Sequence, residues 1–242
     1  MPAVDTLVLP ISSVSSATPS TRLVRLALGG REFVFQAGQA ALIGLAERDE
    51  RVPYSIASAP AETARSGMLE FLVKVEPSGR WGHQFDTLER GGLIGIQGPF
   101  GSFVFPAAPR ERHFLFIAGG TGIAPIRAMI RQALLSGQTG KMKLLYTART
   151  GDDFAYLPEL REMVQQNGLE LRLHATRATP AANAGDTLRT ERGRIGLAQI
   201  APLLDDPATL CFVCGPESML IEVQPMLVSL GIDPARVRIE EW

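Results

Sequence analysis

A tyrosine and a serine follow a proline in the stretch RVPYSIASAP at residues 51–60. The face of the Tyr54 ring could stack on a heteroaromatic ring, and the Ser55 hydroxyl or a backbone N–H could then bond to the edge of that ring. The alternative is an ordinary β-strand that carries a tyrosine. The two interpretations separate only if the rest of the chain supplies a phosphate site and a second nucleotide site.

Two glycine-rich turns are candidate phosphate sites. The turn GGTGIAP at residues 119–125 would place backbone N–H groups at a helix N-terminus, where the helix dipole favours anions. It departs from the GxGxxG pattern because Pro125 stands where the third glycine would be, and a proline is tolerated in the first turn of a helix. The turn GPFGSF at residues 98–103 lies on a predicted hairpin and could bind the phosphates of another nucleotide. For each, the alternative is a tight turn without a ligand.

Arg149 and Arg177 each follow a predicted strand, and parallel strands end at one edge of a sheet. The two arginines could bind a 2′-phosphate, which a guanidinium recognises through two N–H groups. Alternatively, both are solvated surface charges, with Asp152 and Asp153 as ion-pair partners of Arg149.

Cys214 ends a further apolar strand and precedes Gly215 and Pro216. A soft thiol beside a backbone without side-chain bulk would let a planar ring approach. Cys211 and Cys214 alternate with apolar residues, which favours buried strand thiols over a redox disulfide. With two cysteines and three histidines the chain cannot hold an iron–sulfur cluster on four thiolates, and we expect no metal site.

The elements that must position these residues fall into two halves. In the first, apolar residues recur at every second position, as at 24–28 and 69–75. Segments rich in glycine or proline separate such runs, at residues 29–30, 60–67 and 91–92. The pattern predicts antiparallel strands that close into a barrel or sandwich, with a short helix at 81–90. The proline- and charge-rich segment that follows is typical of a linker, so we predict domains at 1–106 and 113–242, joined by 107–112.

Short apolar runs alternate with helical spacing in the second half. Strands are predicted at residues 114–118, 143–148, 169–175, 210–214 and 237–240. Helices are predicted from residue 126 to Gly137 and at 158–167, 197–204 and 217–230, whereas 179–192 is predicted to be a loop. This alternation predicts a parallel doubly wound α/β sheet, whose ligands bind beyond the carboxyl ends of the strands.

Composition excludes several classes of function. The chain has 242 residues, a net charge of -1 and a pI near 6.3, which give no electrostatic footprint for nucleic acid. No apolar run approaches the ~20 residues that a membrane-spanning helix needs. The N-terminal residues MPAVDTLVLP lack a basic n-region and an apolar h-region, so we expect no signal peptide and a cytoplasmic protein.

Four motifs stand in a fixed order: YSIAS at Tyr54, GPFGSF at Gly98, GGTGIAP at Gly119 and CGP at Cys214. Together with an acid and an aromatic residue at the end, this set resembles the ferredoxin-NADP reductase family over nearly the whole chain. The resemblance implies an all-β, six-stranded antiparallel barrel that binds FAD. A five-stranded parallel doubly wound α/β domain that binds NADH or NADPH would follow it.

The resemblance also implies the site residues. Tyr54 would stack on the isoalloxazine, Ser55 would bond near flavin N5, Cys214 and Glu240 would lie near nicotinamide C4, and Trp242 would cover the flavin face. The residues implied for NAD(P)H are Gly119, Gly120, Thr121, Gly122, Pro125, Arg149, Thr176, Arg177, Cys214, Gly215 and Pro216. Those implied for FAD are Arg51, Val52, Pro53, Tyr54, Ser55, Val73, Lys74, Gly79, Trp81, Gly82, Gly98, Gly101 and Ser102.

The chain departs from the family pattern at two positions. The family has an arginine two residues before the tyrosine, where this chain has Val52, and Arg51 stands one residue farther away. A small hydroxyl residue of the family is replaced by Gly82, which leaves a backbone N–H. We therefore expect FAD to be held less tightly than is usual in the family.

The resemblance implies an NAD(P)H-dependent flavoprotein reductase that transfers a hydride from NAD(P)H to flavin N5 and passes electrons to a separate acceptor. That acceptor would be a ferredoxin, a flavodoxin, an oxygenase component or free flavin. One alternative is a free-flavin reductase that uses flavin as substrate. Another is a non-catalytic flavin- and nucleotide-binding electron-transfer subunit of a larger complex. We expect a monomer.

Overall fold

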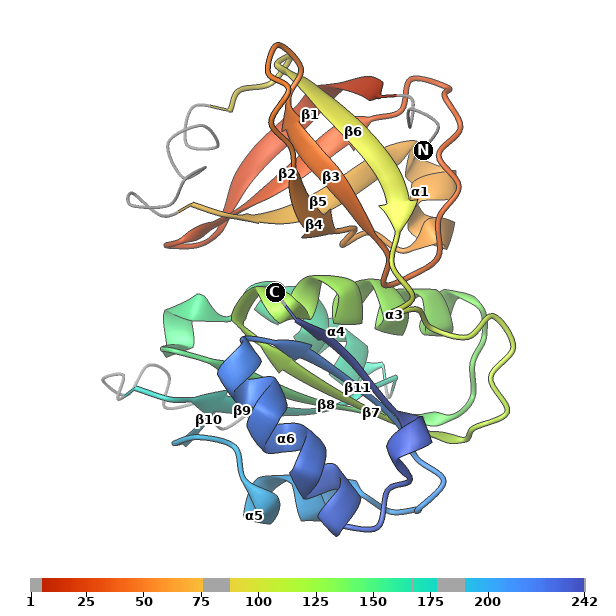
Figure 1. The fold of residues 1–242 in the computed structure, drawn as a ribbon, viewed down its shortest axis with the longest axis vertical. Coiled ribbons are helices and arrows are strands. Elements are labelled where there is room, and N and C mark those ends of the chain that lie inside the picture. The colour runs from red at the N-terminus through yellow and green to blue at the C-terminus, as the bar shows by residue number, and fades with distance from the viewer. Residues whose placement is uncertain (1–5, 76–87, 167, 178–189, 242) are drawn as a thin grey trace. The chain divides into compact units, whose positions relative to one another are not determined.

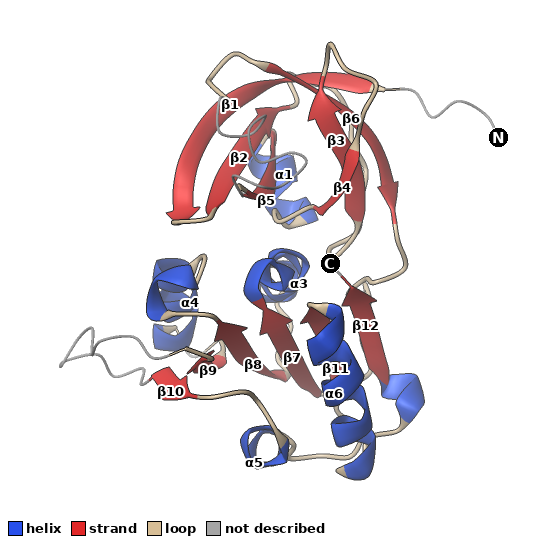
Figure 2. Ribbon diagram, turned by 60° about the vertical axis from the view of Figure 1, so that its left-hand side comes forward, coloured by secondary structure: helices blue, strands red, loops and turns tan. Residues whose placement is uncertain are grey.

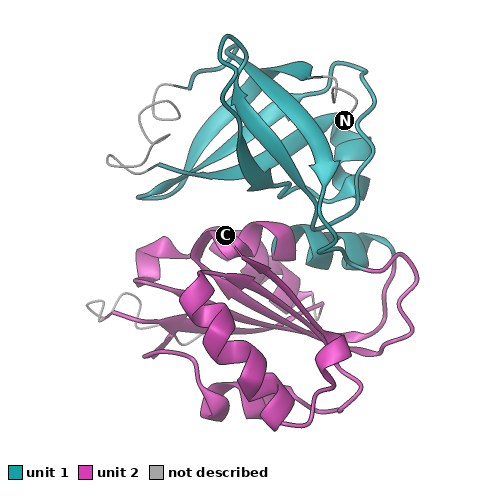
Figure 3. Ribbon diagram, viewed as in Figure 1, with its two compact units in different colours: residues 1–105, 127–136 teal, residues 106–126, 137–242 magenta. Residues whose placement is uncertain are grey.

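The computed structural model describes residues 6–75, 88–166, 168–177 and 190–241. The chain divides into two compact units (Figure 3). Unit 1 comprises residues 1–105 and 127–136, and unit 2 comprises residues 106–126 and 137–242. Within the described residues, no helix is both long and apolar enough to cross a membrane.

Unit 1 is built on one six-stranded antiparallel sheet, as predicted (Figure 1), but the sheet is open, with β4 and β5 at its two ends, and is not a closed barrel. Its strands lie in the order β4-β3-β6-β1-β2-β5. Their bounds are Leu7–Thr18 for β1, Thr21–Ala27 for β2, Ala40–Leu45 for β3, Val52–Ser55 for β4, Met68–Lys74 for β5 and Leu93–Phe100 for β6. The outermost strands β4 and β5 meet through the isolated antiparallel bridge between Ile56 and Phe71.

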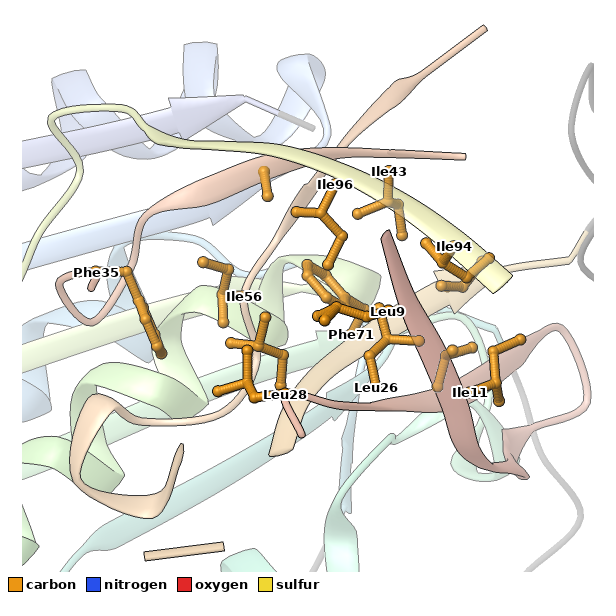
Figure 4. Close-up of a cluster of buried hydrophobic side chains, with 14 residues drawn as sticks. Leu9, Ile11, Leu26, Leu28, Phe35, Ile43, Ile56, Phe71, Ile94 and Ile96 are labelled. Atoms are coloured by element: carbon orange, nitrogen blue, oxygen red, sulfur yellow. The ribbon is translucent and has the colours of Figure 1, made fainter. Parts of the chain in front are cut away.

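The core of this sheet follows from the period-two pattern of its strands. Leu69, Phe71 and Val73 of β5 are fully buried, and Figure 4 shows Phe71 among Leu9, Leu26 and Ile96 from other strands. Replacing a buried phenylalanine with alanine typically costs about 3–5 kcal/mol of stability. On β5 the alternating residues line the core, while Glu70 and Leu72 on the opposite face are buried as well.

Two predictions about unit 1 need correction. Residues 60–67 are not a simple break between strands, because Pro60–Ser66 form α1, with Pro60 in the first turn and Gly67 as a left-handed C-cap at φ 66°. The turn GPFGSF is not on a hairpin, since β6 continues to Phe100, which pairs with Ala40 of β3. The helix predicted at 81–90 falls mostly outside the described residues.

Unit 2 is built on a parallel sheet, also as predicted, with the strand order β10-β9-β8-β7-β11-β12. The strand bounds are His113–Gly119 for β7, Lys141–Ala148 for β8, Glu170–Ala175 for β9, Thr190–Arg192 for β10, Leu210–Gly215 for β11 and Val237–Glu241 for β12. All five predicted strands are present. The short edge strand β10 adds a sixth inside the segment predicted to be a loop, because its exposed residues Thr-Glu-Arg carry no apolar signal.

Helices cover both faces of the parallel sheet, with α5 and α6 on one face and α4 on the other (Figure 2). Their bounds are Ile123–Leu135 for α3, Leu157–Gln165 for α4, Leu197–Ile200 for α5 and Glu217–Ser229 for α6. Short 3-10 turns are η1 at Gly120–Gly122, η2 at Gly151–Asp153, η3 at Ala201–Leu203 and η4 at Pro234–Arg236. The predicted helix at 197–204 is α5 followed by η3, and α6 continues through Pro225.

Candidate functional site

The turn GGTGIAP joins the first strand of the parallel sheet to a helix. Gly119 ends β7, Gly120–Gly122 form η1, and α3 begins at Ile123 with Pro125 in its first turn. Gly119 is the N-cap of η1 and provides no side chain that could bond to the first N–H groups. Gly120, at φ 54°, has open space where a Cβ would stand. Backbone N–H groups at such a helix start are free to bind an anion, so the turn fits a pyrophosphate.

Glycines pack this turn directly against the CGP turn. A Cβ on Gly122 would collide with the carbonyl oxygen of Cys214, and a Cβ on Gly119 would lie 2.9 Å from the Pro216 ring. A Cβ on Gly215 would lie 3.1 Å from the Gly119 backbone. The two motifs, at residues 119–125 and 214–216, are far apart in the sequence, and the structure brings them together at one sheet edge.

Tyr146 supports the glycine turn through a hydrogen bond and could not be identified from the sequence. Its hydroxyl donates a hydrogen bond to the carbonyl oxygen of Gly120 at 3.1 Å and accepts one from the N–H of Ala155 at 3.2 Å. Burial raises the pKa of Tyr146, so the hydroxyl keeps its proton. In the sequence Tyr146 is simply a tyrosine near the end of an apolar strand, and nothing in that pattern indicates a contact with the glycine turn.

A row of buried polar side chains, also missed, continues from Gly119 across the sheet. Thr147 of β8 is in register with Gly119 on one side and with His174 of β9 on the other. The Oγ1 atom of Thr147 is buried without a hydrogen-bond partner, whereas Nε2 of His174 lies 3.3 Å from a carboxylate oxygen of Glu191. Burial lowers the pKa of His174. The unpartnered hydroxyl of Thr147, in register with the glycine that ends β7, fits a site that binds a polar ligand.

Cys214 and Glu240, both predicted to lie near the nicotinamide, are neighbours in the parallel sheet. They are in register on the parallel strands β11 and β12. Burial, followed by the nearby charge of Glu240, raises the pKa of the Cys214 thiol well above its ordinary value. Cys211 and Cys214 are both buried and free, which confirms the prediction of strand thiols. Trp242 lies outside the described residues.

Arg149 and Arg177 lie side by side just beyond the carboxyl ends of β8 and β9. The N–H of Arg177 donates to the carbonyl oxygen of Arg149 at 2.8 Å, and both side chains are exposed. Thr176 donates to the carbonyl oxygen of Ala148 through its N–H at 2.9 Å and its hydroxyl at 3.3 Å. Asp153, at the end of η2, accepts hydrogen bonds from the N–H and hydroxyl of Thr150, the N-cap of that turn. In the described part of the chain, neither arginine forms an ion pair.

Tyr54 and Ser55 lie at the end of β4 in unit 1. Tyr54 pairs with Ala41 of β3, and its half-buried ring packs against the hydrophobic core, while Ser55 is buried. Burial raises the pKa of Tyr54 to about 12, so its hydroxyl stays protonated at physiological pH. Pro53 is exposed and Val52 is half-buried. A partly covered tyrosine ring at the end of a strand fits stacking on a flat heteroaromatic group.

Arg51 precedes this strand and is engaged by the β3–β4 connection. Its Nη1 donates hydrogen bonds to the carbonyl oxygens of Leu45 and Glu50 at 3.3 Å and 3.2 Å, and to that of Arg48. The guanidinium lies against the paired glycines Gly44 and Gly95, where a Cβ on Gly95 would be 2.9 Å from its Cζ. The Nε atom is buried without a hydrogen-bond partner.

The remaining residues implied for FAD are spread through unit 1. Val73 is fully buried in the core, so only its backbone remains for a ligand, whereas Lys74 is exposed. Gly98 lies within β6, and the exposed Gly101 and Ser102 follow it. Gly79, Trp81 and Gly82 lie outside the described residues. Among the described residues, no cluster of side chains could hold a metal ion.

Two family models match the chain. The oxidoreductase FAD-binding domain matches residues 8–105, and the oxidoreductase NAD-binding domain matches residues 116–224. The chain therefore combines an FAD-binding domain with an NAD-binding domain, as expected from the resemblance, and is a flavoprotein oxidoreductase.

Relatives and solved structures agree with this assignment. Ferredoxin–NADP reductase B of Sorangium cellulosum is 29% identical over 88% of this chain and 87% of its own length. The reductase component of the naphthalene 1,2-dioxygenase system of Pseudomonas putida is 28% identical over 94% of this chain and 66% of its own. The ferredoxin reductase in carbazole 1,9a-dioxygenase has the same fold, with a TM-score of 0.80 at 23% identity over 100% of this chain and 71% of that one. With both domains present in the same order, the chain belongs to the ferredoxin-NADP reductase family of FAD- and NAD(P)H-dependent oxidoreductases.

Proposed function

We propose that the chain takes electrons from NADH or NADPH and delivers them, through FAD, to a separate ferredoxin, flavodoxin or oxygenase component. The observation that carries the proposal is the packing of Gly122 against the Cys214 carbonyl, which sets a pyrophosphate turn beside the turn suited to a nicotinamide. Relatives named as a ferredoxin–NADP reductase and as the reductase component of a dioxygenase system support the class of acceptor.

On the flavin side, residues of the chain would bind and orient the flavin ring, and the cofactor itself would carry out the redox chemistry. FAD, when bound, would accept a hydride from NAD(P)H and release electrons to the acceptor. Tyr54 would stack on the isoalloxazine, and Ser55 would hydrogen-bond to its edge. Gly98, Gly101 and Ser102 would border its phosphates. Since the Tyr54 hydroxyl stays protonated, it adds no charge beside the ring.

On the nucleotide side, each group would hold one part of NAD(P)H. The turn at residues 119–125 would bind the pyrophosphate through backbone N–H groups. Arg149 and Arg177 would bind the 2′-phosphate of NADPH. Cys214 and Glu240 would border the nicotinamide, with Cys214 as an uncharged contact because its raised pKa keeps the thiol protonated.

The two cysteines of this chain are too few to bind an iron–sulfur cluster on four thiolates, so the proposal assigns the acceptor to another electron carrier. One observation favours a second candidate, a free-flavin reductase. Three carbonyl oxygens engage Nη1 of Arg51, which reduces its capacity to hold the pyrophosphate of FAD. We propose the flavoprotein reductase as the first function and a monomer as its working form.

Purification and one spectrum separate these functions. The flavoprotein reductase is expected to emerge yellow from gel filtration, with FAD bound, and to reduce ferricyanide with NADH or NADPH. A colourless chain that oxidises NAD(P)H only when flavin is added would be the free-flavin reductase. A chain that oxidises neither NADH nor NADPH in the presence of FAD and ferricyanide would refute both functions and leave a non-catalytic binding subunit.

A further inference from the structure

A partly buried carboxylate in unit 1 forms ion pairs with two arginines of α3. The carboxylate of Glu62, in the first turn of α1, accepts hydrogen bonds from Nη1 and Nη2 of Arg127 at 2.7 Å and 3.2 Å. It also accepts a hydrogen bond from Nε of Arg131 at 2.6 Å. Both arginines belong to residues 127–136, the part of α3 that groups with the antiparallel sheet in unit 1. Such a two-point arginine–carboxylate pair fixes direction as well as distance.

Arg127 also contacts the segment that follows β4, the strand that carries Tyr54 and Ser55. Its Nη1 donates a hydrogen bond to the carbonyl oxygen of Ala57 at 2.8 Å, and the arginine is only 7% exposed. Ala57 comes two residues after Ser55, and its own N–H donates to the carbonyl oxygen of Glu70 on β5 at 2.8 Å. Arg127 therefore holds one side of the segment through which β4 meets β5.

The rest of this segment is held by the same helix and by a serine. Oε2 of Glu62 accepts a hydrogen bond from the N–H of Ala59 at 2.9 Å. The hydroxyl oxygen of Ser58 accepts hydrogen bonds from the Thr63 hydroxyl at 3.0 Å and from the N–H of Glu70 at 3.1 Å. Every residue from Ser55 to Ala59 is buried. A buried network with these partners leaves the segment little freedom to move.

We propose that Arg127 is a positioning residue for the flavin: by fixing the carbonyl of Ala57, it fixes the Tyr54 ring and the Ser55 hydroxyl in the geometry that binds the isoalloxazine. This inference rests on the proposed function. Arg127 acts through the backbone, so its removal weakens flavin binding while the Tyr54 ring and the Ser55 hydroxyl remain present. Sequence patterns do not mark it, since it stands in a helix far from the flavin motifs.

Arg131 offers a matched control. It bonds to the same carboxylate, and changing either arginine to glutamine removes one positive charge from Glu62. FAD would be titrated into the flavin-free chain while the fluorescence that flavin loses on stacking against an aromatic ring is followed. Arg127→Gln is expected to raise the FAD dissociation constant about tenfold and to reduce the quenching at saturation, because a buried charged hydrogen bond is lost. Arg131→Gln is expected to stay within about threefold of the original chain.

Two results would overturn the inference. One is an equal change of FAD affinity in both variants, and the other is quenching at saturation that Arg127→Gln leaves intact. If Arg127→Gln fails to fold, as judged by circular dichroism, Arg127→Lys replaces it, because lysine keeps a donor for Ala57 but loses the two-point pair. Arg127→Lys is then expected to bind FAD with full quenching, and loss of quenching would refute the role of the Ala57 bond. Failure of the unaltered chain to bind FAD at all would refute the proposed function instead.

Discussion

The hydroxyl of Tyr146 donates a hydrogen bond to the carbonyl oxygen of Gly120, at 3.1 Å, in the middle of the glycine turn. Tyr146→Phe would keep the ring, which packs edge-on against Phe154 with centroids 5.0 Å apart, and remove only the hydroxyl. We expect KM for NADH and NADPH to rise about fivefold, since the neutral hydrogen bonds to the Gly120 carbonyl and from the Ala155 N–H are both lost, while FAD affinity stays unchanged. Steady-state kinetics and an FAD titration check this. An unaltered KM would show that Tyr146 has no influence on the turn.

The contact between Gly122 and Cys214 predicts a severe effect for a single methyl group. Gly122→Ala would force a Cβ into the Cys214 carbonyl, so the two turns would have to separate. We expect NAD(P)H binding to fall at least about tenfold and the melting temperature to drop. Gly196→Ala is the matched control, because its Cβ would meet only the Gln199 side chain at 3.5 Å. Equal behaviour of the two variants in NAD(P)H titrations would contradict the steric argument.

The exposed pair Arg149 and Arg177 predicts the choice between NADPH and NADH. Arg177→Ala would remove a guanidinium from the edge where a 2′-phosphate would lie, so KM for NADPH should rise about tenfold or more while KM for NADH stays the same. Arg65→Ala, at an exposed position of α1 in unit 1, serves as the control for lost positive charge. Equal effects on the two nucleotides would end the assignment of Arg177 to the 2′-phosphate.

Glu62 predicts a pH dependence of stability. Burial alone would raise the pKa of Glu62, but the charge of Arg127 and the bonds to Ala59, Arg131 and Arg127 lower it below the ordinary value of 4.5. A carboxyl with a depressed pKa stabilises the fold above its unfolded pKa and loses that contribution as the pH falls through its folded pKa. Urea unfolding from pH 6 down to pH 3 should therefore show a steeper loss for the original chain than for Glu62→Gln. Parallel curves would contradict this.

The buried cysteines predict chemical inertness. Burial raises the pKa of Cys211 to about 12, and burial with the nearby Glu240 raises the pKa of Cys214. Because the thiolate is the reactive form, the folded chain should not react measurably with a thiol-specific reagent at neutral pH. Both cysteines should react once the chain is unfolded in guanidinium chloride. Rapid labelling of the folded chain, located by mass spectrometry at Cys214, would show that this turn is open to solvent.

Sequence patterns predicted the fold well because both halves have clear apolar periods. The alternation around Phe71 and the short apolar run before Gly119 each indicate one type of strand. Elements without such a signal were missed, as α1 was because it begins with a proline inside a loop-like segment, and β10 because its residues are exposed.

The candidate site divides in the same way. Motifs carried by turns, such as GGTGIAP and CGP, could be recognised because glycine is required where backbones approach each other. The supporting side chains Tyr146, Thr147 and Arg127 could not, since each acts through a contact with a residue distant in the sequence. The sequence shows that Arg51 stands one residue before the position where the family has its arginine. The hydrogen bonds from Arg51 to carbonyl oxygens of its own loop could not be predicted from the sequence.

If this chain uses NAD(P)H to reduce its own bound flavin, anaerobic mixing of the two will show the reduction without any acceptor. The FAD-loaded chain would be mixed with one equivalent of NADH or NADPH in a stopped-flow spectrophotometer while the yellow flavin band is followed. The band is expected to bleach with at least one of the two nucleotides before any acceptor is added. A flavin band that persists with both nucleotides would rule out reduction of the bound flavin by NAD(P)H.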